Sequence, residues 1–268
     1  MKLPNLRFRL YRLISRLRPA ILAVAVKRLC GVRRLAYATP GGVFFIDPCS
    51  NLGLSLAQSG VYEPGMRQVF EEMLRPGGTC IDLGANEGYF TVTAARIVGP
   101  TGRVVAVEPQ SRLRQIILRN LELNGLQGIA VEKVGISDRD GTAKLFLFPN
   151  VNTGASGFLR QTKYPVPSER VPVITLEALL KKYRVESCDL LKIDVEGFEY
   201  EVVLGSKDVF LRHVPKAIAL ELHPHALSMR GLRQSAITDF LEQAGYARDQ
   251  RFQNVVYAVS ECHANPGQ

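Results

Sequence analysis

The sequence predicts an α/β fold, in which a largely parallel sheet is built from strands that alternate with helices. Short apolar runs alternate with segments of helical spacing between residues 79 and 259, and this alternation is typical of parallel sheets. Residues 79–90, TCIDLGANEGYF, have the pattern of a strand, a glycine turn and the start of a helix. Such a crossing binds an anionic or nucleoside ligand at the carboxyl end of the strand.

The glycine turn has the spacing Asp82-x-Gly84-x-x-x-Gly88, which differs from the G-x-G-x-x-G pattern of dinucleotide sites. Residues without a Cβ let the main chain approach a ligand closely. The Asp82 carboxylate would repel a pyrophosphate but attract an ammonium group. The turn therefore favours S-adenosylmethionine, which carries an amino-acid end and a sulfonium, over a dinucleotide.

The net charge of +9 is located almost entirely at the N-terminus. Residues 1–46 hold ten basic residues and no acidic one, which leaves 24 basic and 25 acidic residues in the remainder. The sequence therefore predicts a basic N-terminal segment, 1–46, and a catalytic domain, 47–268, with its motifs between about 77 and 225. A nearly neutral domain does not favour a nucleic-acid partner.

The five cysteines favour a reducing compartment. Their number is odd, and none forms a C-x-x-C pair. Such cysteines are typical of buried thiols rather than of a disulfide framework or a zinc site. We therefore expect a cytoplasmic protein, either free or bound at the inner face of the membrane.

Residues 1–35 predict a basic amphipathic helix. Apolar residues recur at helical spacing with arginines between them, Pro19 would kink the helix, and the apolar run 20–26 is too short to span a bilayer. Three interpretations stay open: a helix packed on the body with a solvated basic face, a peripheral contact with a membrane or partner, and an export signal without a convincing cleavage site.

The remaining elements follow in order. Residues 36–62 predict turns around one short strand, and Tyr62 and Glu63 are either structural or within reach of a ligand. The stretches 150–157 and 164–172 predict a long, substrate-binding insertion. Predicted helices are 63–74, a helix from 89 onward, 111–123, 175–183 and 233–244. Predicted strands are 43–46, 79–83, 103–107, 129–134, 143–148, 173–174, 190–195, 217–222 and 255–259.

Two further acids follow predicted strands. Glu108 ends the second strand of the core and is followed by Pro109, which prevents the strand from continuing. A carboxylate at this place accepts hydrogen bonds from both ribose hydroxyls. Asp138, or the backbone beside it, would meet the adenine, although Asp138 could equally be a turn residue.

Ionisable residues also lie at the ends of two later strands. Lys192 and Asp194 are two positions apart, share one face of a strand and could form a buried salt bridge, and Glu196 follows them. Glu221 and His223 likewise share one face. An imidazole titrates near neutral pH, so His223 is a candidate general base.

Seven motifs stand in a specific order and spacing: IDLGANEGYFT (81–91), VEP (107–109), GISDRDG (135–141), NTG (152–154), VITLEALL (173–180), LKIDVEGFE (191–199) and ELH (221–223). Taken together, these motifs resemble the FkbM family of S-adenosylmethionine-dependent methyltransferases over about residues 60–260. The resemblance implies a Rossmann-like class I methyltransferase fold, with a seven-stranded, mostly parallel sheet, helices on both faces and an antiparallel last strand. It also implies methyl transfer to a hydroxyl of a sugar, glycolipid or polyketide-type acceptor.

The resemblance also implies roles for individual residues. It assigns the ribose to Glu108 and the adenine region to Asp138, with Ala85 and Pro109 beside the cofactor. The methionine end is assigned to Asp82, Gly84, Asn86 and Gly88, and the acceptor side to Lys192, Asp194, Glu196, Glu221 and His223.

Two mechanisms are open at the acceptor side. In the first, His223 is the base that removes the hydroxyl proton, and Asp194 or Glu196 orients it or the acceptor. In the second, Asp194 and Glu221 hold a divalent cation that lowers the pKa of the hydroxyl.

Two other functions compete with this one. A nucleic-acid methyltransferase would need a basic catalytic face and stacking aromatic residues. A non-catalytic nucleoside-binding module docked at a membrane would not need the carboxylates at positions 82 and 108, and both are present. We therefore expect a small-molecule or glycan acceptor and no nucleic acid, and a peripheral membrane contact through residues 1–35 stays one of the open interpretations. The oligomeric state is open.

Overall fold

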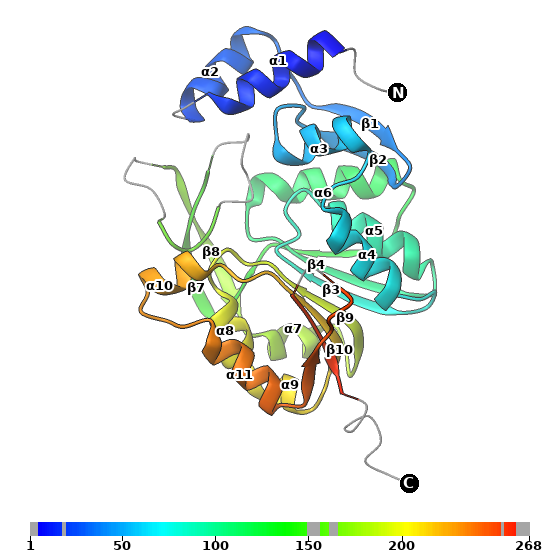
Figure 1. Ribbon diagram of the computed structural model, residues 1–268, viewed down its shortest axis with the longest axis vertical. Helices are drawn as coiled ribbons and strands as arrows, with labels where there is room; N and C mark the ends of the chain where they lie inside the picture. Colours follow the sequence, from blue (N-terminus) through cyan, green and yellow to red (C-terminus); the bar gives the residue numbers. More distant parts are fainter. Residues whose placement is uncertain (1–4, 18–19, 149–155, 161–165, 253–254, 261–268) are drawn as a thin grey trace.

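A seven-stranded sheet forms the centre of the computed structural model, which describes residues 5–17, 20–148, 156–160, 166–252 and 255–260 (Figure 1). Its strand order is β11-β12-β10-β9-β3-β4-β5. Five neighbouring strands are parallel, and β12 runs antiparallel to β10 and β11. The predicted mostly parallel sheet with an antiparallel last strand is confirmed. The strands are β3 (Thr79–Leu83), β4 (Arg103–Val107), β5 (Ala130–Glu132), β9 (Cys188–Ile193), β10 (Pro215–Leu220), β11 (Tyr246–Arg248) and β12 (Val255–Val259).

Helices cover both faces of this sheet, as predicted. One core cluster holds Cys80 from β3 together with side chains of α4 (Pro64–Met73), α5 (Tyr89–Val98) and α6 (Ser111–Leu123). The other holds Ile81 and Leu83 from the same strand. Successive side chains of a strand point to opposite faces, so a strand buried on both faces is continuously apolar. The second cluster also contains side chains of α7 (Leu176–Lys182), α8 (Glu199–Leu204), α9 (Lys207–Leu211) and α11 (Ser235–Gln243).

A small second sheet replaces part of the predicted insertion. It consists of β6 (Gly135–Ile136), β7 (Gly141–Phe146) and β8 (Ser168–Ile174), with β8 in the middle. The prediction of a long loop over 164–172 is therefore wrong from residue 168 on, because this segment pairs along the whole of β7. The Asn-Thr-Gly stretch at 152–154 lies outside the described residues.

The N-terminal part lies at one end of the molecule (Figure 1). It comprises α1 (Asn5–Arg16), α2 (Ala20–Leu29), β1 (Leu35–Thr39), β2 (Gly42–Ile46) and α3 (Asn51–Ser59). The sequence-based prediction missed β1 and α3. Helix α3 begins where the Ser50 side chain accepts a hydrogen bond from the backbone N–H of Gly53, and it ends at Gly60 in a left-handed conformation. No helix in the described parts of the chain is long and apolar enough to cross a membrane.

Candidate active site

Two adjoining cavities lie at the carboxyl ends of the parallel strands. Their empty space, which is partly open to solvent, measures about 550 Å³ and 530 Å³. Gly84, Asn86 and Asp194 line both of them. The two cavities are therefore neighbours, and their common wall lies where the glycine turn after β3 passes the end of β9.

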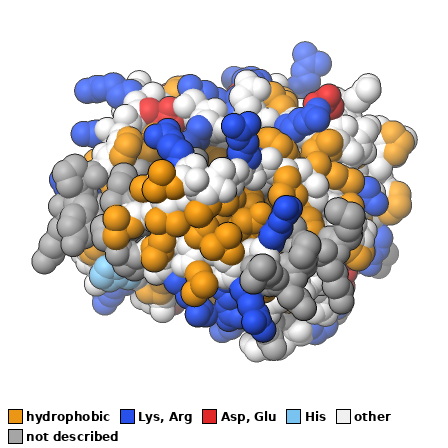
Figure 2. Space-filling view, turned by 90° about the horizontal axis from the view of Figure 1, so that it is seen from above, with side chains coloured by type: hydrophobic (Ala, Val, Ile, Leu, Met, Phe, Trp, Pro, Cys, Tyr) orange, Lys and Arg blue, Asp and Glu red, His pale blue; other side chains and the backbone are white. Residues whose placement is uncertain are grey.

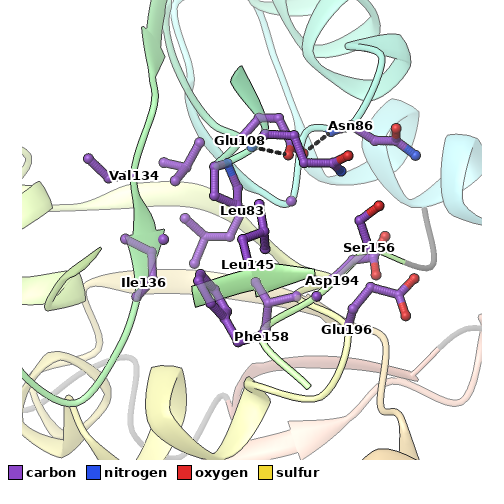
Figure 3. A pocket seen from close by; sticks show the side chains of 17 residues that line it. Leu83, Asn86, Glu108, Val134, Ile136, Leu145, Ser156, Phe158, Asp194 and Glu196 are labelled. Carbon is purple, nitrogen blue, oxygen red and sulfur yellow. Dashed lines mark hydrogen bonds between the residues drawn. The ribbon is translucent and has the colours of Figure 1, made fainter. Parts of the chain in front are cut away.

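The first cavity is mainly apolar and carries one buried carboxylate (Figure 3). Glu108, which is 3% exposed, accepts hydrogen bonds from the backbone N–H of Asn86, at 2.8 Å, and of Gln110, at 2.9 Å. Burial raises the pKa of Glu108 to about 7, although these hydrogen bonds act in the opposite direction. The apolar lining includes Leu83, Val107, Val134, Ile136, Leu145 and Phe158.

The second cavity is more polar. Tyr62 and Glu63 both line it, so the interpretation that they reach a ligand site agrees with their position. Lys192 and Asp194 supply opposite charges to its wall, and Ser50, Asn51, Ala85 and Glu87 are also part of the lining. The cavity can thus offer both a cation and carboxylates to a charged ligand.

The glycine turn is held tightly between two elements. Gly84 has φ +77°, and a Cβ there would lie 1.7 Å from the backbone oxygen of Asp194. Gly88 has φ +82°, and a Cβ there would lie 3.1 Å from the Ile117 side chain of α6. Gly88 lines neither cavity, so it shapes the turn rather than the wall of the site.

Asp82 lies beneath the site and lines neither cavity. Its side chain is completely buried and accepts a 2.6 Å hydrogen bond from Thr91. The Lys192 ammonium lies 3.4 Å from a carboxylate oxygen of Asp82 and 3.4 Å from one of Asp194. Burial lowers the pKa of Lys192, but the Asp194 and Asp82 carboxylates raise it by more. The position of Asp82 therefore supports an action through Lys192 rather than a direct contact with the cofactor.

The ionisable residues after β9 and β10 meet around one imidazole. His223 Nδ1 lies 2.8 Å from Oε1 of Glu199, and Nε2 lies 3.4 Å from Glu196 and 4.0 Å from Asp194. Burial lowers the pKa of His223, but the hydrogen bond to Glu199 and the nearby carboxylates raise it to about 9. Burial and the neighbouring carboxylates raise the pKa of Glu196 to about 7, although the charge of His223 lowers it. Near neutral pH, His223 is therefore mostly protonated.

One ligand atom each from Asp194, Glu196 and His223 lies within 4.8 Å of the others, close enough to share a cation. The pair predicted for this purpose was Asp194 and Glu221. Glu221 is exposed and lies outside this group.

Three features of the structure differ from the sequence-based predictions. Asp138 is half-exposed and lines neither cavity, whereas Gly135 and Ile136, just before it, line the first, as does Pro109. The predictions gave no role to Phe158, although an aromatic residue after a glycine-rich loop is a usable signal. They also gave none to Glu199, whose contact with His223 joins two distant segments.

A family model described as "Methyltransferase FkbM domain" matches residues 82–247. The chain is 26% identical over 208 residues to "AMB antimetabolite synthetase AmbE" of Pseudomonas aeruginosa, covering 65% of this chain and 10% of that protein. It is 30% identical over 154 residues to "Methyltransferase sdnD" of Sordaria araneosa, covering 47% of this chain and 59% of that protein. It thus spans less than two thirds of the length of these two relatives. A crystal structure of Methyltransferase FkbM from Methylobacillus flagellatus KT is similar with a TM-score of 0.44 at 15% identity, covering 76% and 52% of the two chains.

Proposed function

Because the chain belongs to the FkbM methyltransferase domain family, we propose that this S-adenosylmethionine-dependent enzyme methylates a hydroxyl oxygen of a small-molecule acceptor. Sugars, glycolipids and polyketide-type molecules are the proposed acceptor classes. The observation that carries the proposal is the pair of neighbouring cavities, one mainly apolar with a buried carboxylate and the other charged. An elongated ligand with a nucleoside at one end and an amino acid at the other matches this division.

The residues present fit this cofactor. The apolar lining of the first cavity suits an adenine ring, and the Glu108 carboxylate suits the ribose hydroxyls. In the second cavity, Lys192 would receive the carboxylate of the methionine end, and Asp194 or Glu63 its ammonium group. The bound cofactor supplies an activated methyl group on sulfur. The protein has to align an acceptor oxygen with that methyl group and remove the hydroxyl proton.

Glu196 is the base that we propose, in place of His223. A base must be unprotonated in the free enzyme, and a pKa of about 9 leaves most His223 protonated near neutral pH. The Glu196 carboxyl has a pKa of about 7 and lines the first cavity. His223, held by Glu199, would orient Glu196 through the 3.4 Å contact.

A divalent cation at this cluster is the second mechanism, and the shared spacing of Asp194, Glu196 and His223 favours it. A cation there would lower the pKa of an acceptor hydroxyl. Dialysis against a chelator, followed by readdition of Mg²⁺ or Mn²⁺, separates the mechanisms. Unchanged turnover after chelation would support Glu196 as the base. Turnover that is lost on chelation and restored only by the metal would support the divalent-cation mechanism instead.

The proposed function is tested in two stages. Calorimetric titration of the purified chain with S-adenosylmethionine should show one site, and no measurable binding would contradict the assignment of the cavities. Incubation with methyl-labelled cofactor and a panel of hydroxyl-bearing sugars, glycolipids and polyketides should then label an oxygen, identified by NMR. Label on nitrogen or carbon would overturn the O-methyl proposal and leave the cofactor site intact.

A further inference from the structure

The outer surface of α1 and α2 carries most of the exposed large hydrophobic side chains. Leu10, Leu13, Leu22 and Leu29 are 42%, 64%, 48% and 88% exposed, and only two others in the described residues, Leu211 and Met229, belong to the same class. Figure 2 shows this end of the molecule, with a hydrophobic area between groups of Lys and Arg. We call these four leucines the outer leucines. Such a gathering marks an interaction surface.

The outer leucines do not serve the packing of the helices on the body. Other side chains do that: Ile14 and Ala23 are buried together with Cys49. Helix α1 is therefore apolar toward the body and again toward solvent at Leu10 and Leu13, one turn apart. A helix that only covered the protein would need one apolar face.

The charges that the N-terminal segment itself carries are of one sign. Residues 1–46 contain no acid, and none of the exposed arginines on this segment makes an ion pair within the described residues. These arginines are Arg7, Arg9, Arg12, Arg16, Arg28 and Arg33.

Two other cations fasten the segment. Lys27 pairs with the buried carboxylate of Asp47, and Arg34 lies 2.6 Å from the buried carboxylate of Glu87. The inward cations thus fix the segment to the domain, while the outward ones remain available to a partner.

We propose that α1 and α2 form a docking surface for an anionic lipid bilayer, on which they lie flat. The leucines enter the boundary between headgroups and acyl chains, and the arginines contact anionic headgroups. A second copy of this chain fits the surface less well, because a two-fold interface would bring the same arginines against one another. Nucleic acid would match the arginines but would leave the outer leucines exposed to water.

The test is sedimentation of the full chain with vesicles. Vesicles of equal parts phosphatidylcholine and phosphatidylglycerol should bind the protein, and pure phosphatidylcholine should bind it far more weakly, with the difference shrinking as salt rises. The double variant Arg9→Gln/Arg12→Gln should bind anionic vesicles about thirtyfold more weakly, since each basic residue near such a surface contributes about 1 kcal/mol. Its control is Arg139→Gln/Arg248→Gln, which removes two exposed arginines elsewhere.

The leucines are tested separately. Leu13→Gln/Leu29→Gln should weaken vesicle binding by about tenfold or more, and Leu211→Gln, an exposed leucine outside the segment, should not. All of these positions are exposed, so cofactor affinity and the circular dichroism spectrum should match those of the parent protein. Binding of the leucine and arginine variants equal to that of their controls would overturn the proposal. The variants could instead lose self-association, measured by light scattering, while their vesicle binding stays unchanged. That result would overturn the proposal in favour of a dimer interface.

Discussion

Nζ of Lys192 lies 3.4 Å from Oδ1 of Asp82, and both side chains are almost completely buried between β3 and β9. The two residues are register partners in the parallel pairing of these strands. The same ammonium also donates a 3.1 Å hydrogen bond to the backbone oxygen of Gly84. One buried cation thus connects the two central strands, the glycine turn and the second cavity.

Lys192→Met should destabilise the fold strongly, because it leaves the Asp82 carboxylate buried without its partner. We expect a loss of about 3–5 kcal/mol in the free energy of unfolding, measured by urea denaturation. The control is Lys216→Met, which breaks the largely exposed 2.8 Å pair with Asp189 and should cost less than about 1 kcal/mol. Equal losses for the two variants would show that the buried pair has no special role.

Gly84→Ala should be far more damaging than a substitution at a glycine with a similar backbone. A Cβ at position 84 would lie 1.7 Å from the backbone oxygen of Asp194, which cannot move without shifting the end of β9. Gly125 also has a positive φ, of +65°, but a Cβ at that position would have nothing within 4 Å. We expect Gly125→Ala to lower the free energy of unfolding by about 1–2 kcal/mol. Gly84→Ala should lower it by about 3 kcal/mol or more and should also abolish cofactor binding. Similar melting temperatures for the two variants would contradict this expectation.

Cofactor affinity should fall as the pH is lowered through about 7. In the proposed complex the ribose hydroxyls donate to the ionised form of Glu108, whose pKa burial raises to about 7 in the free protein. Binding then releases a proton, so each pH unit below 7 should weaken affinity by up to about tenfold. Glu108→Gln should remove this dependence and weaken binding at pH 8 by roughly ten- to a hundredfold. The control is Glu122→Gln, on the exposed side of α6. If Glu108→Gln kept the pH dependence of cofactor affinity, that dependence would belong to another group.

The pH dependence of kcat/KM for the acceptor separates Glu196 from His223 as base, provided that saturating cofactor removes the contribution of Glu108. With Glu196 as base, the rate should rise through a pKa near 7 and then level off, whereas His223 as base would place this rise near 9. Glu196→Gln should lower turnover by roughly a hundredfold or more. His223→Asn should shift the apparent pKa above 7, because it removes the positive charge that lowers the pKa of Glu196. If the kcat/KM profile of Glu196→Gln kept its pKa near 7, Glu196 would be excluded as the base.

Much of the fold could be predicted because local pattern decides it. The strands 79–83 and 103–107 are mostly apolar, and their burial on both faces is the direct consequence. The helix α3 was missed because it is short, contains Gly53 and begins at a side-chain cap that only a local hydrogen bond reveals. The last part of the predicted insertion, 168–172, belongs to β8 because pairing with β7 outweighs its weak strand pattern.

The sequence by itself determined the parallel sheet, the glycine turn, the acids at the strand ends and the basic N-terminal segment, since periodicity, spacing and charge are local properties. Only the tertiary structure decided that Asp194 and Glu108 face the cavities while Asp82 pairs with Lys192 beneath them. It alone placed Glu199 against His223 and the outer leucines in solvent. These outcomes depend on distances between residues far apart in the chain and on how far each group is removed from water, and both arise only when the elements pack together.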